Sequence, residues 1–278
     1  MSVRRFPDVH PLTRKSFIGG LAAVVAAGGQ AAERGAISAV SVKGADLFGG
    51  GHLATKAASW RKGGFNLVLI DVQDSVRYPS HPEIATARSL PPEKVGRAVA
   101  VLKECGMDVV PLLDFATCND GWLGEYDRMV CSKRYDAVVC DLIRDAYGIF
   151  DTPKFIHIGF GDEGRSTHPP GGFAVMRQGD LWMRYLVRTA GWVKETGARA
   201  WAWFDYPWGM KDFLADCPRD IVYSNLKPLS EKRTADRILQ VVKAGCDVIP
   251  FVRGLKDSAV AARLPSAHVL GMLKEVAG

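Results

Sequence analysis

Short apolar runs alternate with amphipathic segments along the chain from residue 37 onward. The apolar runs are rich in β-branched and aromatic residues and predict strands over 37–42, 65–72, 107–114, 154–161, 198–205, 220–225 and 247–252. The segments between them repeat their apolar positions at helical spacing and predict helices over 54–62, 91–105, 130–147, 180–195, 210–215 and 231–244. Strands that are apolar throughout are typical of a parallel sheet covered on both faces.

This alternation predicts an α/β fold, and the number of strands favours a (β/α)8 TIM barrel over an open, doubly wound sheet. No GxGxxG or P-loop motif follows a strand, which counts against a nucleotide-binding sheet. Near the C-terminus, 267–273 could add a further strand, or Ser266 could cap a closing helix. If the strand forms, the barrel is incomplete at its C-terminal helix, and the apolar surface left exposed would favour a homodimer.

The first 36 residues resemble an export signal. Basic side chains precede a Gly/Ala-rich stretch over 18–27; they are Arg4, Arg5, Arg14 and Lys15. Segment 13–18, Thr-Arg-Lys-Ser-Phe-Ile, resembles the twin-arginine signature with Lys in its second basic position. The alternative is an alanine-rich helix or a tail, and the glycines within 19–29 disfavour the helix. We expect 1–36 to be an export signal or flexible N-terminus and 37–278 to be a catalytic-type barrel, in a bacterial protein that is periplasmic or secreted.

Composition and charge exclude several classes of protein. With 47% hydrophobic and 24% charged residues, the chain has the composition of a globular protein, not of a collagen-like or disordered one. The net charge is +6, and 1–36 supply +3 of it because they contain five basic and two acidic side chains. The modest charge of the body gives no reason to expect a nucleic-acid partner. No apolar run is long enough to be a membrane-spanning segment.

The six cysteines show no CxxC pair and no Cys/His spacing typical of a zinc site, so we expect no structural metal. Cys105, Cys140 and Cys246 lie among apolar residues and are interpreted as small core residues. Cys118 and Cys131 flank a polar loop and could pair in a disulfide.

Polar residues follow the predicted strands at their carboxyl ends. They are Asp71, Gln73, Asp114, Asp162, Glu163, Asp205 and Asn225. In a TIM barrel these ends meet at one mouth, where active sites are built. Capping of the following helices is the alternative explanation, and it accounts less easily for the adjacent carboxylates Asp162 and Glu163.

Segment 157–163, His-Ile-Gly-Phe-Gly-Asp-Glu, is the densest group of polar residues. In a regular strand the alternate residues from His157 to Glu163 point to one side, and the glycines permit a bulge that would bring Asp162 to that side. Two crowded carboxyls cannot both ionise freely, so we expect one to have a raised pKa and to donate a proton near neutral pH. A histidine followed by adjacent carboxylates is no recognised metal-ligand spacing, and we expect neither metal nor cofactor.

This segment resembles the His-x-Gly-Gly-Asp-Glu motif of family 20 glycoside hydrolases, the β-N-acetylhexosaminidases, with Phe160 as an additional residue. Further segments are similar to that family in the same order; they are 66–84, 107–111, 203–205 and 220–225. The resemblance implies a glycoside substrate and hydrolysis of terminal N-acetylhexosamine residues by a substrate-assisted retaining mechanism, in which the acetamido oxygen of the sugar attacks the anomeric carbon.

The resemblance also implies roles for individual residues. Glu163 would be the general acid/base, and Asp162 would orient the acetamido group. The expected substrate-binding residues are His157, Asp71, Asp74, Asp114, Trp122, Trp203, Asp205 and Asn225. Trp201 shares a strand face with Trp203 and is expected to lie deeper, in the barrel core. Stretch 112–122 lacks the Pro-Gly-His turn of the family, which leaves a catalytically inactive carbohydrate-binding barrel as the alternative function.

Overall fold

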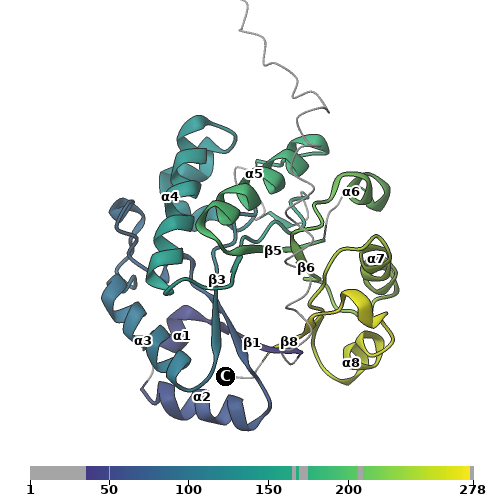
Figure 1. Ribbon diagram of the computed structural model, residues 1–278. Helices are drawn as coiled ribbons and strands as arrows, with labels where there is room; N and C mark the ends of the chain where they lie inside the picture. The colour runs from purple at the N-terminus through teal and green to yellow at the C-terminus, as the bar shows by residue number, and fades with distance from the viewer. Residues whose placement is uncertain (1–35, 50, 165–166, 169–174, 206–208, 276–278) are drawn as a thin grey trace, which may run out of the picture. The chain divides into compact units, whose positions relative to one another are not determined.

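The computed structural model describes residues 36–49, 51–164, 167–168, 175–205 and 209–275, so the expected export signal lies outside the described residues except for its last position. Eight parallel strands form a ring (Figure 1). They are β1 Ile37–Lys43, β2 Leu67–Asp71, β3 Asp108–Leu112, β4 Phe155–His157, β5 Arg199–Trp203, β6 Val222–Ser224, β7 Phe251–Val252 and β8 Gly271–Glu275. Their order in the sheet is β6-β5-β4-β3-β2-β1-β8-β7. The predicted TIM-barrel fold is therefore confirmed.

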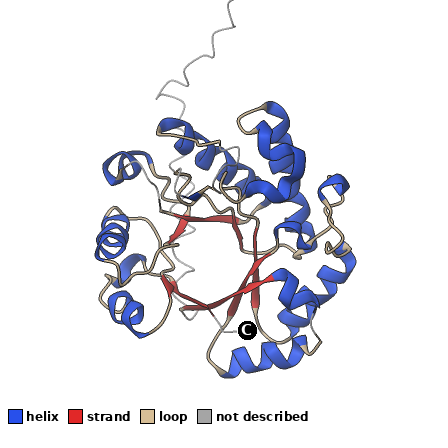
Figure 2. Ribbon diagram, turned by 180° about the vertical axis from the view of Figure 1, so that it is seen from behind, coloured by secondary structure: helices blue, strands red, loops and turns tan. Residues whose placement is uncertain are grey.

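Helices surround the ring of strands on its outer side (Figure 2). They are α1 Gly44–Gly49, α2 Leu53–Lys62, α3 Pro92–Glu104, α4 Lys133–Ile149, α5 Asp180–Thr196, α6 Met210–Asp216, α7 Lys232–Lys243 and α8 Leu255–Ala261. The short helices α1 and α8 were not predicted, because each spans only two turns or fewer and carries no clear apolar period. Within the described residues, none of the helices combines the length and the apolar character needed to cross a bilayer.

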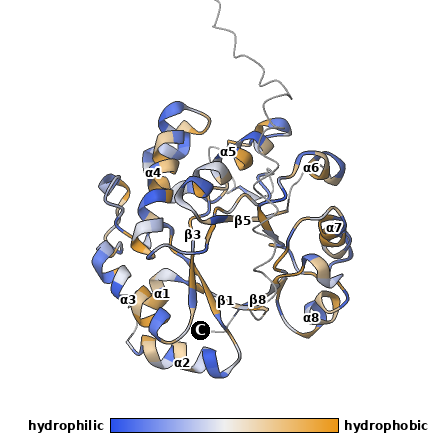
Figure 3. Cartoon of the chain, in the orientation of Figure 1, coloured by the Kyte–Doolittle hydropathy of each residue, from blue (hydrophilic) through white to orange (hydrophobic). Residues whose placement is uncertain are grey.

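Two apolar layers account for strands that are buried on both faces. One layer lies between the strands and the helices. The other fills the barrel interior, with buried side chains from β1, β2, β3, β5, β6, β7 and β8. Trp201 belongs to this inner layer, is fully buried, and donates a hydrogen bond from its indole N–H to Ser224 Oγ (2.7 Å). The prediction that Trp201 is a core residue is confirmed. Coloured by hydropathy, the helices show the blue, hydrophilic stripes expected of surface helices (Figure 3).

The chain region after β7 forms a strand and not a closing helix. A short 3-10 turn at Ser266–His268 precedes β8, which pairs with β1 on one side and β7 on the other. The strand alternative for this region is therefore confirmed, although β8 begins four residues later than 267. Dimerisation through this region stays a prediction.

The barrel wall has a seam between β6 and β7. Across the seam, the described residues form a single isolated bridge, Tyr223 to Val248. Two backbone hydrogen bonds accompany it, from Tyr223 N–H to Asp247 O and from Ile249 N–H to Tyr223 O, each 2.9 Å. Nearer the mouth, hydrogen bonds of the Asn225 side chain take the place of backbone pairing between the strands. The side chain accepts the Phe251 N–H and donates to the Phe251 carbonyl, both at 2.9 Å.

The six cysteines are free thiols. Cys140 and Cys246 are buried, as predicted, whereas Cys105 is only partly buried. A disulfide between Cys118 and Cys131 is contradicted: the Cys118 thiol donates instead to the carbonyl of Asp162.

Candidate active site

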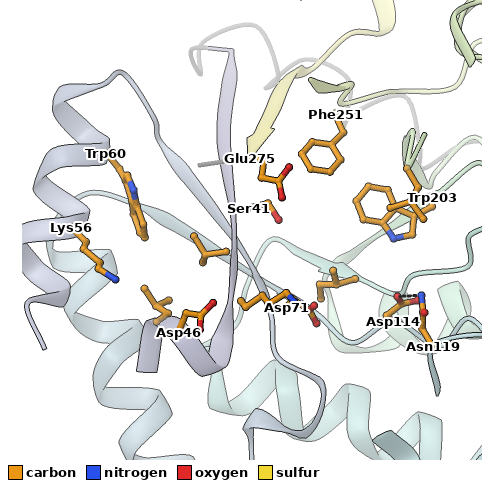
Figure 4. Close-up of a pocket in the computed structure, with 15 residues that line it drawn as sticks. Ser41, Asp46, Lys56, Trp60, Asp71, Asp114, Asn119, Trp203, Phe251 and Glu275 are labelled. Atoms are coloured by element: carbon orange, nitrogen blue, oxygen red, sulfur yellow. Dashed lines mark hydrogen bonds between the residues drawn. The ribbon is translucent and has the colours of Figure 1, made fainter. Parts of the chain in front are cut away.

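A cavity of about 490 Å³ lies at the carboxyl ends of the strands (Figure 4). It is lined by Ser41, Val42, Lys43, Asp46, Leu47, Lys56, Trp60, Asp71, Leu112, Asp114, Asn119, Trp203, Leu226, Phe251 and Glu275. This is the mouth at which barrel enzymes place their chemistry. The cavity has the size of a site for one small ligand, and its lining combines apolar and aromatic side chains with a similar number of polar and charged ones.

Asp114 lies two residues beyond β3, in a backbone conformation with φ of 51°. Its Oδ1 accepts the Ala116 N–H (3.2 Å), and its Oδ2 accepts the Asn119 amide (2.9 Å). Burial raises the pKa of this carboxyl to about 7, and the negative charges of Asp71 and Glu163 contribute in the same direction. Asp114 thus lines the cavity as a carboxyl group that keeps its proton up to near-neutral pH.

Asp71 ends β2 and faces the same cavity (Figure 4). Burial raises its pKa to about 6; Lys43 opposes this shift and Asp74 adds to it. The Asp71 Oδ1 atom is buried and has no hydrogen-bond partner in the described part of the protein. A buried acceptor without a donor is costly, and it suits a ligand that brings an N–H or O–H group.

Aromatic rings form one wall of the cavity. Trp203 and Phe251 stack with their centroids 6.0 Å apart and an angle of 25° between their planes. His157 packs behind Trp203 at 4.3 Å and is fully buried. Its Nδ1 accepts the Gly159 N–H (3.1 Å), and burial lowers its pKa well below the usual value, so it is a neutral supporting residue. The aromatic surface that lines the cavity suits the C–H surface of a sugar ring.

Glu163 lies behind the cavity wall in a buried ion pair with Arg177. Arg177 Nε donates to Glu163 Oε2 (2.9 Å), and Arg177 Nη2 donates both to Glu163 Oε1 and to the Phe115 carbonyl, the latter at 2.7 Å. Glu163 Oε1 also accepts the Thr117 N–H (3.2 Å). The pair therefore holds the loop that begins at Asp114.

Asp162 and Glu163 do not crowd together as predicted from a regular strand. Regular β4 pairing ends at His157, and Gly159 and Phe160 both have positive φ, so the alternation of side chains is interrupted. Asp162 Oδ2 accepts from Lys227 Nζ (3.0 Å), while Glu163 pairs with Arg177. Each carboxylate has its own cation.

The other predicted site residues occupy supporting or separate positions. The Trp122 indole N–H donates to the Asp114 carbonyl (3.2 Å). Asp205 accepts the backbone N–H groups of Leu226 and Lys227, and Asn225 spans the seam. Asp74 is near an exposed arginine. The expected site residues that line the cavity are Asp71, Asp114 and Trp203.

Several cavity residues were not predicted. Lys43 and Glu275 end β1 and β8, so the rule that polar residues at strand ends meet at the mouth, which found Asp71, also applies to them. Phe251 begins β7 and is apolar, so that rule does not reach it. Arg177 carries no such signal, since it lies in a segment outside any regular element, 14 residues after its partner.

Gly159 is required where the chain passes Asp114. Its φ is 78°, and a Cβ at this position would collide with the Asp114 side chain and Cα. We expect Gly159→Ala to lower the free energy of unfolding by about 2 kcal/mol or more, because strain and overlap add. Urea denaturation of the wild type and the variant measures this difference in the free energy of unfolding. Gly121→Ala is the matched control, because its Cβ would meet nothing within 4 Å; equal stability losses in the two variants would contradict the prediction.

No protein-family model matches the chain, and no curated protein sequence matches it either. Solved structures do. The fold is similar to that of family 20 glycoside hydrolases.

Three of these structures illustrate the fold similarity. An exo-β-N-acetylglucosaminidase from Vibrio harveyi has a TM-score of 0.60 and 12% identity, covering 86% of this chain and 50% of its own. A Flavobacterium johnsoniae chitobiase has a TM-score of 0.59 and 11% sequence identity, and the match covers 87% of this chain and 44% of the chitobiase. A Streptomyces plicatus N-acetyl-β-hexosaminidase has a TM-score of 0.57 and 12% sequence identity, and the match covers 78% of this chain and 47% of the hexosaminidase. The chain thus spans half or less of the length of each of these three proteins.

Proposed function

We propose that the chain is a glycosidase that takes a terminal N-acetylhexosamine residue into the mouth cavity, and that 1–36 direct its export. The observation that carries the proposal is the pair of cavity carboxyls, Asp71 and Asp114, whose pKa values are raised to about 6 and about 7 beside an aromatic wall. The family 20 fold supports the class of substrate, since similar structures are described as β-N-acetylglucosaminidases.

In this proposal Asp114 donates the proton to the glycosidic oxygen. Between about pH 6 and pH 7, Asp114 is mostly protonated while Asp71 is mostly ionised, which is the combination an acid and an electrostatic partner require. The acetamido oxygen of the sugar attacks the anomeric carbon as the leaving group departs with the Asp114 proton. Asp71, whose Oδ1 has no partner among the described residues, accepts the acetamido N–H and stabilises the positive charge that develops.

Water then adds to the anomeric carbon of the cyclised intermediate. Asp114, now ionised, takes one proton from the water, and the acetamido group is regenerated. Proton donation by Glu163, implied by the family motif, stays a prediction. We favour Asp114 because Glu163 is fully buried and paired with Arg177, whereas Asp114 lines the cavity. Glu163 and Arg177 then act as positioning residues for the loop that carries Asp114.

A pH series with an aryl N-acetyl-β-hexosaminide tests the proposal. We expect a bell-shaped dependence of kcat/KM on pH centred at about 6.5, because protonation of Asp71 removes activity below about pH 6 and ionisation of Asp114 removes it above about pH 7. The matching aryl glucoside is the control, since it lacks the acetamido nucleophile. Equal hydrolysis of both substrates, or a rate independent of pH from 5 to 8, would contradict the mechanism.

The second candidate function is a barrel that binds the sugar without cleaving it. It is favoured by the buried ion pair of Glu163, which seals the motif carboxylate away from the cavity. Titration with N-acetylhexosamine, followed by the fluorescence of Trp203 and the other tryptophans, separates the two functions. Saturable binding with no turnover between pH 5 and 8 would establish the binding barrel in place of the glycosidase.

A further inference from the structure

Cys217 and Cys246 meet in a buried position remote from the mouth cavity. Cys217 follows α6 and Cys246 follows α7, and their Sγ atoms lie 3.4 Å apart. Both side chains are buried, with relative exposures of 5% and 0%. Of the cysteines in the described part of the chain, these are the two whose sulfur atoms are in contact.

This cysteine pair lies beside the seam of the barrel. Cys217 precedes β6, Cys246 precedes β7, and the single seam bridge starts two residues beyond Cys246, at Val248. Among the described residues, one isolated bridge with two backbone hydrogen bonds joins the two sides of the seam, and the two thiols lie on opposite sides of it. A covalent bond here would join the segments that lead into β6 and β7.

The surroundings of Cys246 favour its thiolate. The Cys217 thiol hydrogen-bonds to the Cys246 sulfur, and Arg219 Nη1 lies 3.1 Å from it; together they lower the pKa of Cys246 to about 6 against the effect of burial. Arg219 is held in place by the carbonyl of Ala244. The same contact raises the pKa of Cys217 above its usual range. Cys246 is thus the nucleophile and Cys217 the resolving thiol.

We propose that Cys217 and Cys246 are a redox site that closes into a disulfide across the seam by exchange with a small-molecule disulfide. The Cys246 thiolate attacks one sulfur of the donor, forms a mixed disulfide and releases one thiolate. The Cys217 thiol then loses its proton and attacks Cys246 Sγ, which releases the second thiolate. The two cysteines are oxidised by two electrons, and the donor is reduced to two thiols.

Only a small movement is needed to form the bond. The sulfurs must approach from 3.4 Å to about 2.0 Å for the bond to form. Because both sulfurs are buried, the exchange occurs when the 217–221 segment opens locally or while the seam is forming. The disulfide would close a loop between positions 29 apart, so it would restrict the unfolded chain and stabilise the barrel.

The test compares the reduced full-length protein with the same protein after incubation with oxidised glutathione. We expect loss of two free thiols and a cross-link between the tryptic peptides 212–219 and 244–253, found by mass spectrometry. The thermal midpoint should rise by about 5 °C or more. Hydrogen exchange of the Tyr223 and Ile249 amides, which bond across the seam, should become slower.

Three variants serve as controls. Cys246→Ser and Cys217→Ser should lose the rise in thermal midpoint on oxidation, whereas Cys140→Ser should keep it. Because the comparison is between oxidised and reduced forms of each protein, a lower stability of a variant does not obscure the result. Retention of six titratable thiols in the wild type, or a cross-link to a different cysteine, would overturn the proposal. A 217–246 cross-link that leaves amide exchange at the seam unchanged would overturn the stabilising role.

Discussion

Replacement of Asp114 by Asn is expected to lower kcat for an alkyl N-acetyl-β-hexosaminide by about 100-fold to 10,000-fold. Asparagine keeps the shape of the side chain, and its single amide oxygen can still accept one of the two donors that bind Asp114, the Ala116 N–H or the Asn119 amide, but it has no acidic proton to give to the glycosidic oxygen. The loss should depend on the leaving group. The dinitrophenolate of a dinitrophenyl glycoside departs without being protonated, so the variant should lose little kcat on that substrate. A large loss of kcat on the alkyl substrate beside a small loss on the dinitrophenyl substrate identifies the loss of a general acid.

Two further variants sharpen this experiment. Asp74→Asn is the matched control, because Asp74 is more exposed and lies outside the cavity lining; it should keep most of the activity. Glu163→Gln tests the assignment implied by the family motif. If Glu163→Gln shows the dependence on the leaving group and Asp114→Asn does not, Glu163 is the acid and our assignment of Asp114 is wrong.

Arg177→Met is expected to destabilise the protein by about 3–5 kcal/mol, because it leaves the Glu163 carboxylate buried without its cation. It also removes the donor to the Phe115 carbonyl and frees the loop that positions Asp114. Urea denaturation measures the stability. For folded Arg177→Met, we expect a lower kcat for glycosides with good and poor leaving groups alike, since a displaced loop affects both.

A double variant separates the ion pair from packing. Glu163→Gln combined with Arg177→Met removes both charges, so it should recover part of the stability that Arg177→Met loses. Arg188→Met is the matched control, because the Arg188–Asp136 pair is partly exposed and should contribute less than about 1 kcal/mol. A loss in Arg177→Met no larger than that in Arg188→Met would refute the central role of the buried pair.

The fold was predictable because most strands and most helices carry a strong local pattern; for β8 the pattern left a strand and a helix equally open. Continuous apolar runs such as 65–72 and 107–114 can be buried on both faces only in a covered parallel sheet. The predicted strand 154–161 is the informative exception. Its apolar character is genuine, since Ile156, Ile158 and Phe160 are buried, but positive φ at two residues ends the regular pairing, and composition does not reveal a backbone turn of this kind.

The site was predictable only in part. Asp71 and Asp114 follow from the rule that strand ends meet at the mouth, and the structure brings both to one cavity. The ion pair of Glu163 was not predictable, because its partner comes from a segment that has no periodic pattern and because burial, not spacing, decides whether a carboxyl faces a ligand. The contact of Cys217 with Cys246 is equally invisible in the sequence, since it depends on how two helices end side by side.

The Asn225 side chain has a consequence for how closely the cavity can fit a sugar. Trp203 is on β5 and Phe251 is on β7, so the two stacked rings stand on opposite sides of the seam. Near the rings, the two hydrogen bonds of Asn225 to the Phe251 backbone fasten the two sides together. The stiffness of the aromatic wall, and with it the tolerance for a larger ring substituent, therefore depends on an amide side chain that need not touch the ligand, together with the Ser224 Oγ hydrogen bond to the Ile249 carbonyl.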